Sequence, residues 1–118
     1  MANEIRLAIV GYRNYHNYEL FSREVDSYIN EIGQPNIIIS GGATGVDSMA
    51  VRYAKEHNIS IKEFIPDWSI GKRAGPLRND KIIELATHVL AFRHQLSKGT
   101  NYTIQKAKHL NCRVVEVV

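Results

Sequence analysis

Residues 37–47, IIISGGATGVD, decide the fold. Three consecutive isoleucines form the short apolar run that is typical of a buried strand. Three glycines among residues 41–45 then end the strand, and apolar residues recur at helical spacing from Val46 to His57. The stretch therefore predicts a buried strand that leads into a helix through a glycine-rich turn.

The rest of the chain repeats this alternation of strand and helix. The expected strands are residues 5–10, 36–40, 59–65, 88–92 and 113–118, and the expected helices are residues 18–32, 46–57, 77–86 and 99–110. Such an alternation is typical of right-handed βαβ units wound around a parallel sheet. We expect one α/β, Rossmann-like domain over residues 1–118, with a five-stranded parallel sheet in the order 3-2-1-4-5 flanked by about four helices.

Size and composition exclude several classes of protein. The chain has 118 residues, of which 44% are apolar and 23% charged, so we expect one folded domain rather than a disordered or fibrous protein. It contains no apolar run of the ~20 residues that span a bilayer and no signal peptide, so a cytoplasmic location is expected. A single cysteine, Cys112, excludes an internal disulfide. We expect neither a metal ion nor a cofactor.

Charge is distributed unevenly along the chain. Residues 1–68 carry six basic and nine acidic side chains, whereas residues 69–118 carry nine basic and three acidic ones. The excess of positive charge in the second half favours an anionic partner, such as a nucleotide phosphate or a nucleic-acid backbone. Composition alone is equally consistent with a solvated, lysine-rich surface.

Ligands of such sheets bind beyond the carboxyl ends of the strands, where the strand order reverses. This rule predicts a crevice between the loops 11–17, 41–47, 66–78 and 93–100. The basic side chains in these loops are Arg13, Lys72, Arg73, Arg78, Arg93 and Lys98, and the acidic ones are Asp47 and Asp67. Cations thus concentrate where a phosphate would bind.

Two glycine-containing helix starts face the predicted crevice. In residues 40–47, glycines let the backbone approach an anion, and N–H groups at the helix start are donors for phosphate oxygens. A side chain at position 42 would block that approach, so Gly42→Val is expected to abolish binding. The alternative interpretation is an ordinary turn that Asp47 caps. The second helix opens at Lys98-Gly99-Thr100, where Thr100 is alternatively an ordinary N-cap.

Several segments of the chain resemble the small, single-domain YAcAr family of the SLOG superfamily. They are Gly11-Tyr12-Arg13, residues 40–47, Asp67-Trp68, residues 74–79 and Lys98-Gly99-Thr100. The resemblance covers nearly the whole chain, and it implies a Rossmann-like fold that binds a nucleotide or a nucleotide-derived ligand with a phosphorylated ribose. The ligand-binding residues that we expect are Gly11, Arg13, Ser40, Gly41, Gly42, Thr44, Gly45, Trp68, Arg78, Asn79, Lys98, Gly99 and Thr100.

Phosphoribohydrolases of the LONELY GUY type resemble the chain more distantly. These enzymes cleave the N-glycosidic bond of a nucleoside monophosphate, and their arginine and Gly-Thr motif match Arg78 and Gly99-Thr100. Their glutamate position falls on Thr103, so slow hydrolysis would need Asp47 or Asp67 in its place. The candidate catalytic residues implied by this resemblance are Arg78, Asp47 and Asp67. Whether the protein is an enzyme stays open.

DNA-processing protein A is a second distant resemblance, confined to residues 40–47. It implies, as an alternative function, a module that binds single-stranded DNA in recombination. Trp68, Tyr12 and Tyr15 offer rings for stacking on bases, although the base of a mononucleotide would use the same rings. We also expect a homo-oligomer.

Overall fold

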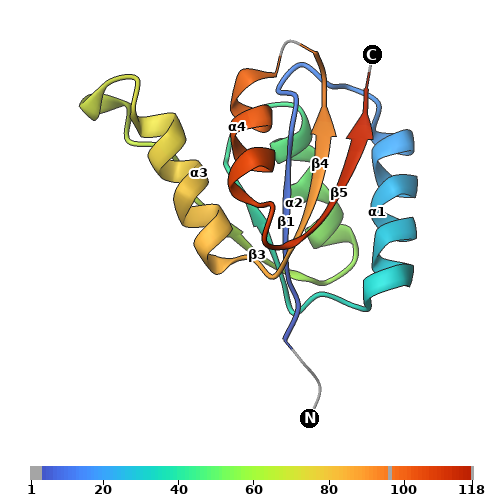
Figure 1. The fold of residues 1–118 in the computed structure, drawn as a ribbon. Coiled ribbons are helices and arrows are strands. Elements are labelled where there is room, and N and C mark those ends of the chain that lie inside the picture. The colour runs from blue at the N-terminus through green and yellow to red at the C-terminus, as the bar shows by residue number, and fades with distance from the viewer. Residues whose placement is uncertain (1–3, 96, 118) are drawn as a thin grey trace.

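Parallel β-strands form the centre of the protein, whose computed structural model describes residues 4–95 and 97–117 (Figure 1). The strands are β1 (Arg6–Gly11), β2 (Ile37–Ser40), β3 (Ser60–Glu63), β4 (His88–Arg93) and β5 (Asn111–Glu116). All neighbouring strands pair in parallel, and their order is β3-β2-β1-β4-β5. The predicted α/β class and strand order are confirmed.

Helices cover both faces of the sheet. They are α1 (Tyr18–Ile32), α2 (Val46–Glu56), α3 (Ala74–Leu85) and α4 (Lys98–Lys106), with a short 3₁₀ helix, η1 (Trp68–Ile70), before α3. Because successive side chains of a strand point to opposite faces, Leu7 and Ile9 pack with α1 and α2, whereas Ala8 and Val10 pack with α3 and α4. The buried strands read as continuous apolar runs for this reason.

Phe21 anchors the α1–α2 side of the core. Its ring is fully buried and lies 5.0 Å from the ring of Phe92 on β4, measured between centroids. It also meets Tyr53 of α2 edge to face at 6.5 Å. One aromatic side chain therefore joins two helices to the sheet.

Several boundaries differ from those expected. Helix α3 begins at Ala74, three residues before the predicted start, so that Pro76 lies inside its first turn. This position suits proline because the first N–H groups of a helix lack intrahelical acceptors. Helix α4 ends at Lys106 rather than at residue 110, and β5 already pairs with β4 from Asn111. The last residue of the predicted fifth strand, Val118, lies outside the described residues.

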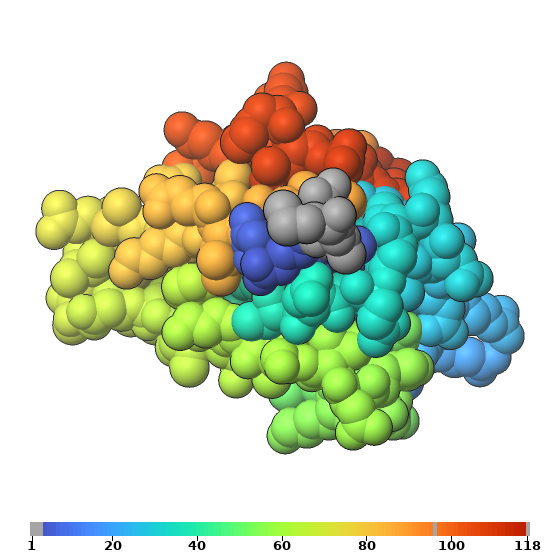
Figure 2. Space-filling view, turned by 90° about the horizontal axis from the view of Figure 1, so that it is seen from below, coloured from blue at the N-terminus to red at the C-terminus, as the bar shows by residue number. Residues whose placement is uncertain are grey.

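The segment around η1, residues 65–77, extends away from the rest of the protein and is called the extended segment below. Figures 1 and 2 show this yellow part of the chain at the far left, in two views turned by 90°. Its exposed apolar side chains are Ile65, Trp68, Ile70 and Leu77. The expected third strand is shorter at both ends than residues 59–65, because β3 pairs with β2 only over Ser60–Glu63. Of the other predicted strand residues, Ile59 is buried in the core on the α1–α2 side, Phe64 packs against the core on the α3–α4 side, and Ile65 belongs to the extended segment.

The carboxyl ends of β1 and β4 and the start of α2 meet at Gly11. A Cβ on Gly11 would lie 2.6 Å from the Phe92 carbonyl oxygen and 2.9 Å from Cγ2 of Val46. Both distances are shorter than van der Waals contact, so this approach requires glycine. The junction coincides with the reversal of strand order, because β1 stands between β2 and β4.

We expect Gly11→Ala to lower the free energy of unfolding by about 1–3 kcal/mol, since the added methyl overpacks a backbone contact. Urea denaturation followed by circular dichroism measures this change. Gly99→Ala is the matched control, because its Cβ would come no closer than 3.9 Å to Nδ2 of Asn79. It should leave the stability unchanged or raise it by up to about 1 kcal/mol. Equal losses in both variants would contradict the close approach at Gly11.

Candidate functional site

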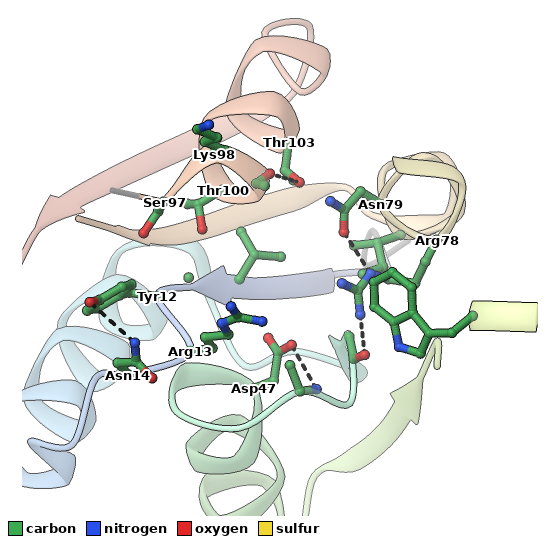
Figure 3. Close-up of a pocket in the computed structure, with 17 residues that line it drawn as sticks. Tyr12, Arg13, Asn14, Asp47, Arg78, Asn79, Ser97, Lys98, Thr100 and Thr103 are labelled. Atoms are coloured by element: carbon green, nitrogen blue, oxygen red, sulfur yellow. Dashed lines mark hydrogen bonds between the residues drawn. The ribbon is translucent and has the colours of Figure 1, made fainter. Parts of the chain in front are cut away.

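A pocket of about 500 Å³ opens beyond the carboxyl ends of the central strands (Figure 3). Its walls come from the loop after β1, the turn after β2, η1, α3 and the start of α4. The expected residues that line it are Gly11, Arg13, Gly41, Asp47, Trp68, Arg78, Asn79, Lys98, Gly99 and Thr100. The expected residues outside the lining are Ser40, Gly42, Thr44, Gly45 and Asp67.

Asp47 provides the carboxyl group of the pocket. The residue is 7% exposed, and its Oδ2 accepts a hydrogen bond from the Ala43 N–H at 3.1 Å. Burial raises the pKa of the Asp47 carboxyl, while the Ala43 N–H and the charge of Arg78 oppose the rise. Figure 3 shows the carboxyl pointing into the pocket, with Arg13 on one side and Arg78 on the other.

Two N–H groups of the glycine-rich turn are hydrogen-bonded within the turn itself. Ser40 Oγ donates to the Asp47 carbonyl at 3.1 Å and accepts from the Gly42 N–H at 3.4 Å. Thr44 Oγ1 donates to the Arg13 carbonyl at 3.1 Å. The Asp47 carboxyl also holds the turn through the Ala43 N–H, although the N-cap position of α2, Gly45, has no side-chain cap. Ser40 and Thr44 thus hold the turn to its neighbours.

The glycines of this turn face different neighbours, so an added side chain would have a different effect at each of them. A Cβ on Gly42 would meet Ile65 at 2.9 Å and lies away from the pocket lining, so the steric reason given for Gly42→Val is wrong. Gly41 is the glycine whose Cβ would intrude, 2.4 Å from Nη1 of Arg78 and 2.9 Å from Oδ2 of Asp47. Gly45 has a φ of +69° and packs on the backbone of Arg13, which accounts for glycine there.

Arg78 is held in place from three directions. Its Nε donates to Oδ1 of Asn79 at 2.8 Å, and its Nη1 donates to the carbonyls of Gly41 and Phe64. Burial lowers the pKa of the Arg78 guanidinium, and the nearby charge of Asp47 partly opposes this. The guanidinium therefore keeps one orientation at the edge of the pocket and joins α3 to the ends of β2 and β3.

The start of α4 forms the opposite wall. Ser97 occupies the N-cap position, and among the described residues no side chain caps the first N–H groups of the helix. Ser97 Oγ instead accepts from the His94 N–H at 3.3 Å. Thr100 lies within the first turn, so the expectation of Thr100 as N-cap is wrong. Uncapped N–H groups at a helix start are donors for an anion.

Thr103 lies one turn further along α4 and also lines the pocket. Its side chain is almost fully buried, and its hydroxyl donates to the Gly99 carbonyl at 3.0 Å. The position that resembles a catalytic glutamate thus carries a neutral group that is already hydrogen-bonded to its own helix. This contact could not be read from the sequence spacing alone.

The cations of the predicted crevice separate into two groups. Arg13 and Lys98 line the pocket and are exposed, and neither forms an ion pair within residues 4–95 and 97–117. Arg93 lies outside the lining and pairs with Glu116 on the neighbouring strand. Figure 3 places Arg13 near the centre of the pocket, whereas Lys98 rises from the outer side of α4.

Asp67 lies outside the pocket lining, at the start of η1. Its Oδ1 accepts from the N–H of Ser69 at 3.1 Å and from its hydroxyl at 2.5 Å, and these bonds lower the pKa of the Asp67 carboxyl. The adjacent Trp68 is 64% exposed and does line the pocket. A Cβ on Gly75 would lie 3.6 Å from Cη2 of Trp68, so the indole rests beside the start of α3.

The three rings considered for base stacking occupy different environments. Tyr15 is buried, with its ring 6.0 Å from that of Phe92, so the expectation that it stacks on a base is wrong. Tyr12 lines the pocket and stacks on His94 with a centroid distance of 4.3 Å. Lining residues that the sequence did not single out include Asn14 and Ser97. Their place directly after β1 and before α4 is the signal that would have identified them.

Comparisons with known proteins agree with this fold. The family model of the YspA, cpYpsA-related SLOG family matches residues 5–71, more than half of the chain. A solved structure of DNA processing protein A from Streptococcus pneumoniae is similar, with a TM-score of 0.59 and 17% sequence identity. The similarity covers 95% of this chain and 59% of that one. No curated protein matches the chain.

Within residues 4–95 and 97–117, no helix has the length and apolar character needed to cross a membrane. The same residues contain no group of three or more His, Cys, Asp and Glu side chains arranged to hold a metal ion.

We expect the stability of Asp47→Asn, relative to the unmodified protein, to increase as the pH rises. The folded protein binds the Asp47 proton more tightly than the unfolded chain, because burial raises the pKa of this carboxyl. The unmodified protein therefore loses stability between about pH 4, the ordinary aspartate value, and the raised pKa, whereas asparagine does not titrate. Urea denaturation at a series of pH values measures the difference. A relative stability that falls with rising pH would contradict this assignment.

Proposed function

Because the chain belongs to the YspA, cpYpsA-related SLOG family, we propose that its pocket binds a nucleotide or a nucleotide-derived ligand through a phosphorylated ribose. The observation that carries this proposal is the uncapped start of α4, which faces the exposed guanidinium of Arg13 across the pocket. Helix N–H groups and a cation together suit a phosphate. The volume of about 500 Å³ is in the range of small-ligand sites.

The phosphate is assigned to the α4 side of the pocket rather than to the glycine-rich turn. In the turn, the N–H groups of Gly42 and Ala43 already donate to Ser40 and Asp47. Binding a phosphate there would break these bonds and bring it close to the Asp47 carboxyl. At α4, the first-turn N–H groups and the hydroxyl of Thr100 are the available donors.

Arg78 and Trp68 would contact the other parts of the ligand. The guanidinium of Arg78 is fixed before any ligand binds, so a charge-assisted hydrogen bond from it costs little conformational entropy. Trp68 stands at the mouth of the pocket with most of its ring exposed, which suits stacking on a base. Burial of this ring by a ligand would also account for an exposed tryptophan.

Catalysis of N-glycosidic hydrolysis is expected to be slow. Asp47 is the only carboxyl side chain among the described residues that line the pocket, and it is already oriented by the turn. Thr103 offers no carboxylate at the position where the LONELY GUY-type enzymes have glutamate. Loss of such a group typically reduces a rate by about 10²- to 10⁴-fold. Asp67 would have to leave its bonds to Ser69 to take part.

Isothermal titration with nucleoside monophosphates, cyclic nucleotides and ADP-ribose tests the proposed binding. We expect Arg13→Ala to weaken the binding of the best ligand by about 10-fold or more, because it removes a charge-assisted contact to phosphate. The control is Arg23→Ala, which removes an exposed arginine that pairs with Glu19 on α1. Silence across the panel at millimolar ligand would overturn the proposal.

Chromatography of adenosine monophosphate incubated with the protein tests the expected slow hydrolysis. The unmodified protein should release little free base, and Thr103→Glu should release more if the ribose lies beside α4. Asp47→Asn and Asp67→Asn show whether either carboxyl supports the residual rate. Fast release that survives both asparagine substitutions would show that the chemistry does not depend on these groups.

Single-stranded DNA binding is the second candidate function. The favouring observation is the extended segment, on which the exposed Trp68 lies near the exposed cations Lys72 and Arg73. An aromatic ring with neighbouring cations suits a single strand, and affinity for it should fall steeply with salt. Gel shifts with oligothymidylate across a salt series test this, and retardation that is absent at low salt would remove the candidate. The expected homo-oligomer stays a prediction.

A further inference from the structure

The pocket contains a charge that a phosphate alone does not explain. Its other charged lining side chains are the cations Arg13, Arg78 and Lys98, yet the carboxyl of Asp47 points in among them. A carboxylate repels a phosphate, and the repulsion is stronger in a partly buried site than in water. A site selective for inorganic phosphate would be better without it. A ligand with a hydrogen-bond donor beside its anionic group would match both the cations and the carboxyl.

Asp47 is built to receive such a donor. It is 7% exposed, so its orientation is determined by the protein, and the Ala43 N–H holds one oxygen at 3.1 Å. A carboxylate accepts about four hydrogen bonds, which leaves capacity on the side that faces the pocket. The start of α4, where the phosphate is assigned, forms the opposite wall (Figure 3).

The chemistry of nucleotides supplies the matching donor. In a ribonucleotide, the 2′- and 3′-hydroxyls lie on the same sugar as the 5′-phosphate and donate without adding positive charge. An internal nucleotide of DNA has no 2′-hydroxyl, and its 3′-oxygen is esterified, so its sugar offers no donor. The Asp47 carboxyl thus complements ribonucleotides and opposes a DNA backbone.

We infer that Asp47 is a specificity-determining residue, which accepts a hydrogen bond from the 2′- or 3′-hydroxyl of a ribose and thereby selects such a ligand over the deoxy form that lacks this hydroxyl and over an internal nucleotide of DNA. The inference rests on the proposed function. A deoxy ligand would leave the buried carboxylate without its donor, and lost hydrogen bonds to charged groups correspond to about 10- to 100-fold in affinity. For inorganic phosphate the sign reverses, because removal of the carboxylate charge removes only repulsion.

Calorimetric titration of the full chain tests this inference with matched pairs of ligands. The probes are adenosine monophosphate with its 2′-deoxy and 3′-deoxy forms, ribose 5-phosphate with 2-deoxyribose 5-phosphate, and inorganic phosphate. The proteins are the unmodified chain, Asp47→Asn and the control Glu84→Gln, which removes an exposed carboxyl of α3 outside the pocket lining. Asparagine keeps an amide oxygen for the Ala43 N–H, so the turn is expected to persist, which circular dichroism checks.

The expected result is that the unmodified chain and Glu84→Gln prefer the ribose form of at least one pair by about 10-fold or more, and that Asp47→Asn binds both forms within about twofold. Asp47→Asn should also bind inorganic phosphate more tightly. Equal binding of ribose and deoxyribose forms by the unmodified chain would overturn the inference and leave the proposed function standing. Unchanged selectivity in Asp47→Asn would overturn it as well. Absence of binding to every ribose phosphate would overturn the proposed function itself.

Discussion

The arrangement of the site depends on the burial of Asp47 beside Arg78 across the backbone of Gly41. A buried carboxylate is costly unless it is hydrogen-bonded and near a positive charge. The Ala43 N–H and the guanidinium of Arg78 offset part of this cost, and only glycine at position 41 lets the groups come so close. Since Arg78 also binds the carbonyls of Gly41 and Phe64, the same contact positions α3 against the ends of β2 and β3.

This arrangement makes the pocket bipolar. One wall presents the uncapped N–H groups of α4, and the side across from it presents the guanidinium of Arg13 and, beside it, the Asp47 carboxyl that accepts hydrogen bonds (Figure 3). A ligand that satisfies both walls needs an anion and a neutral donor at a short separation. The sugar-phosphate part of a nucleotide has this character, so a single ligand of this kind would engage both walls at once.

Most of the fold was predictable because apolar periodicity reports burial directly. The triple isoleucine of β2 and the helical spacing after Val46 left little choice of fold class, and right-handed crossovers set the order of the strands. Partners distant in sequence were not predictable. Arg93 is tied to Glu116 through the register of β4 and β5, and the Gly42 N–H is tied to a serine hydroxyl. Glycines in a turn indicate that other atoms approach the backbone closely, but they do not identify those atoms.

The two walls also separate recognition from chemistry. A carboxyl on α4 at position 103 would stand on the wall assigned to the phosphate, whereas Asp47 stands on the wall of the turn, with one oxygen engaged by the backbone. A group that activates water or stabilises a cationic sugar must approach the anomeric carbon. A carboxyl held by its own turn is instead suited to receive a hydrogen bond from a fixed direction. The proposed site therefore combines a carboxyl that can receive a hydrogen bond with a Thr103 hydroxyl that stays bound to its own helix.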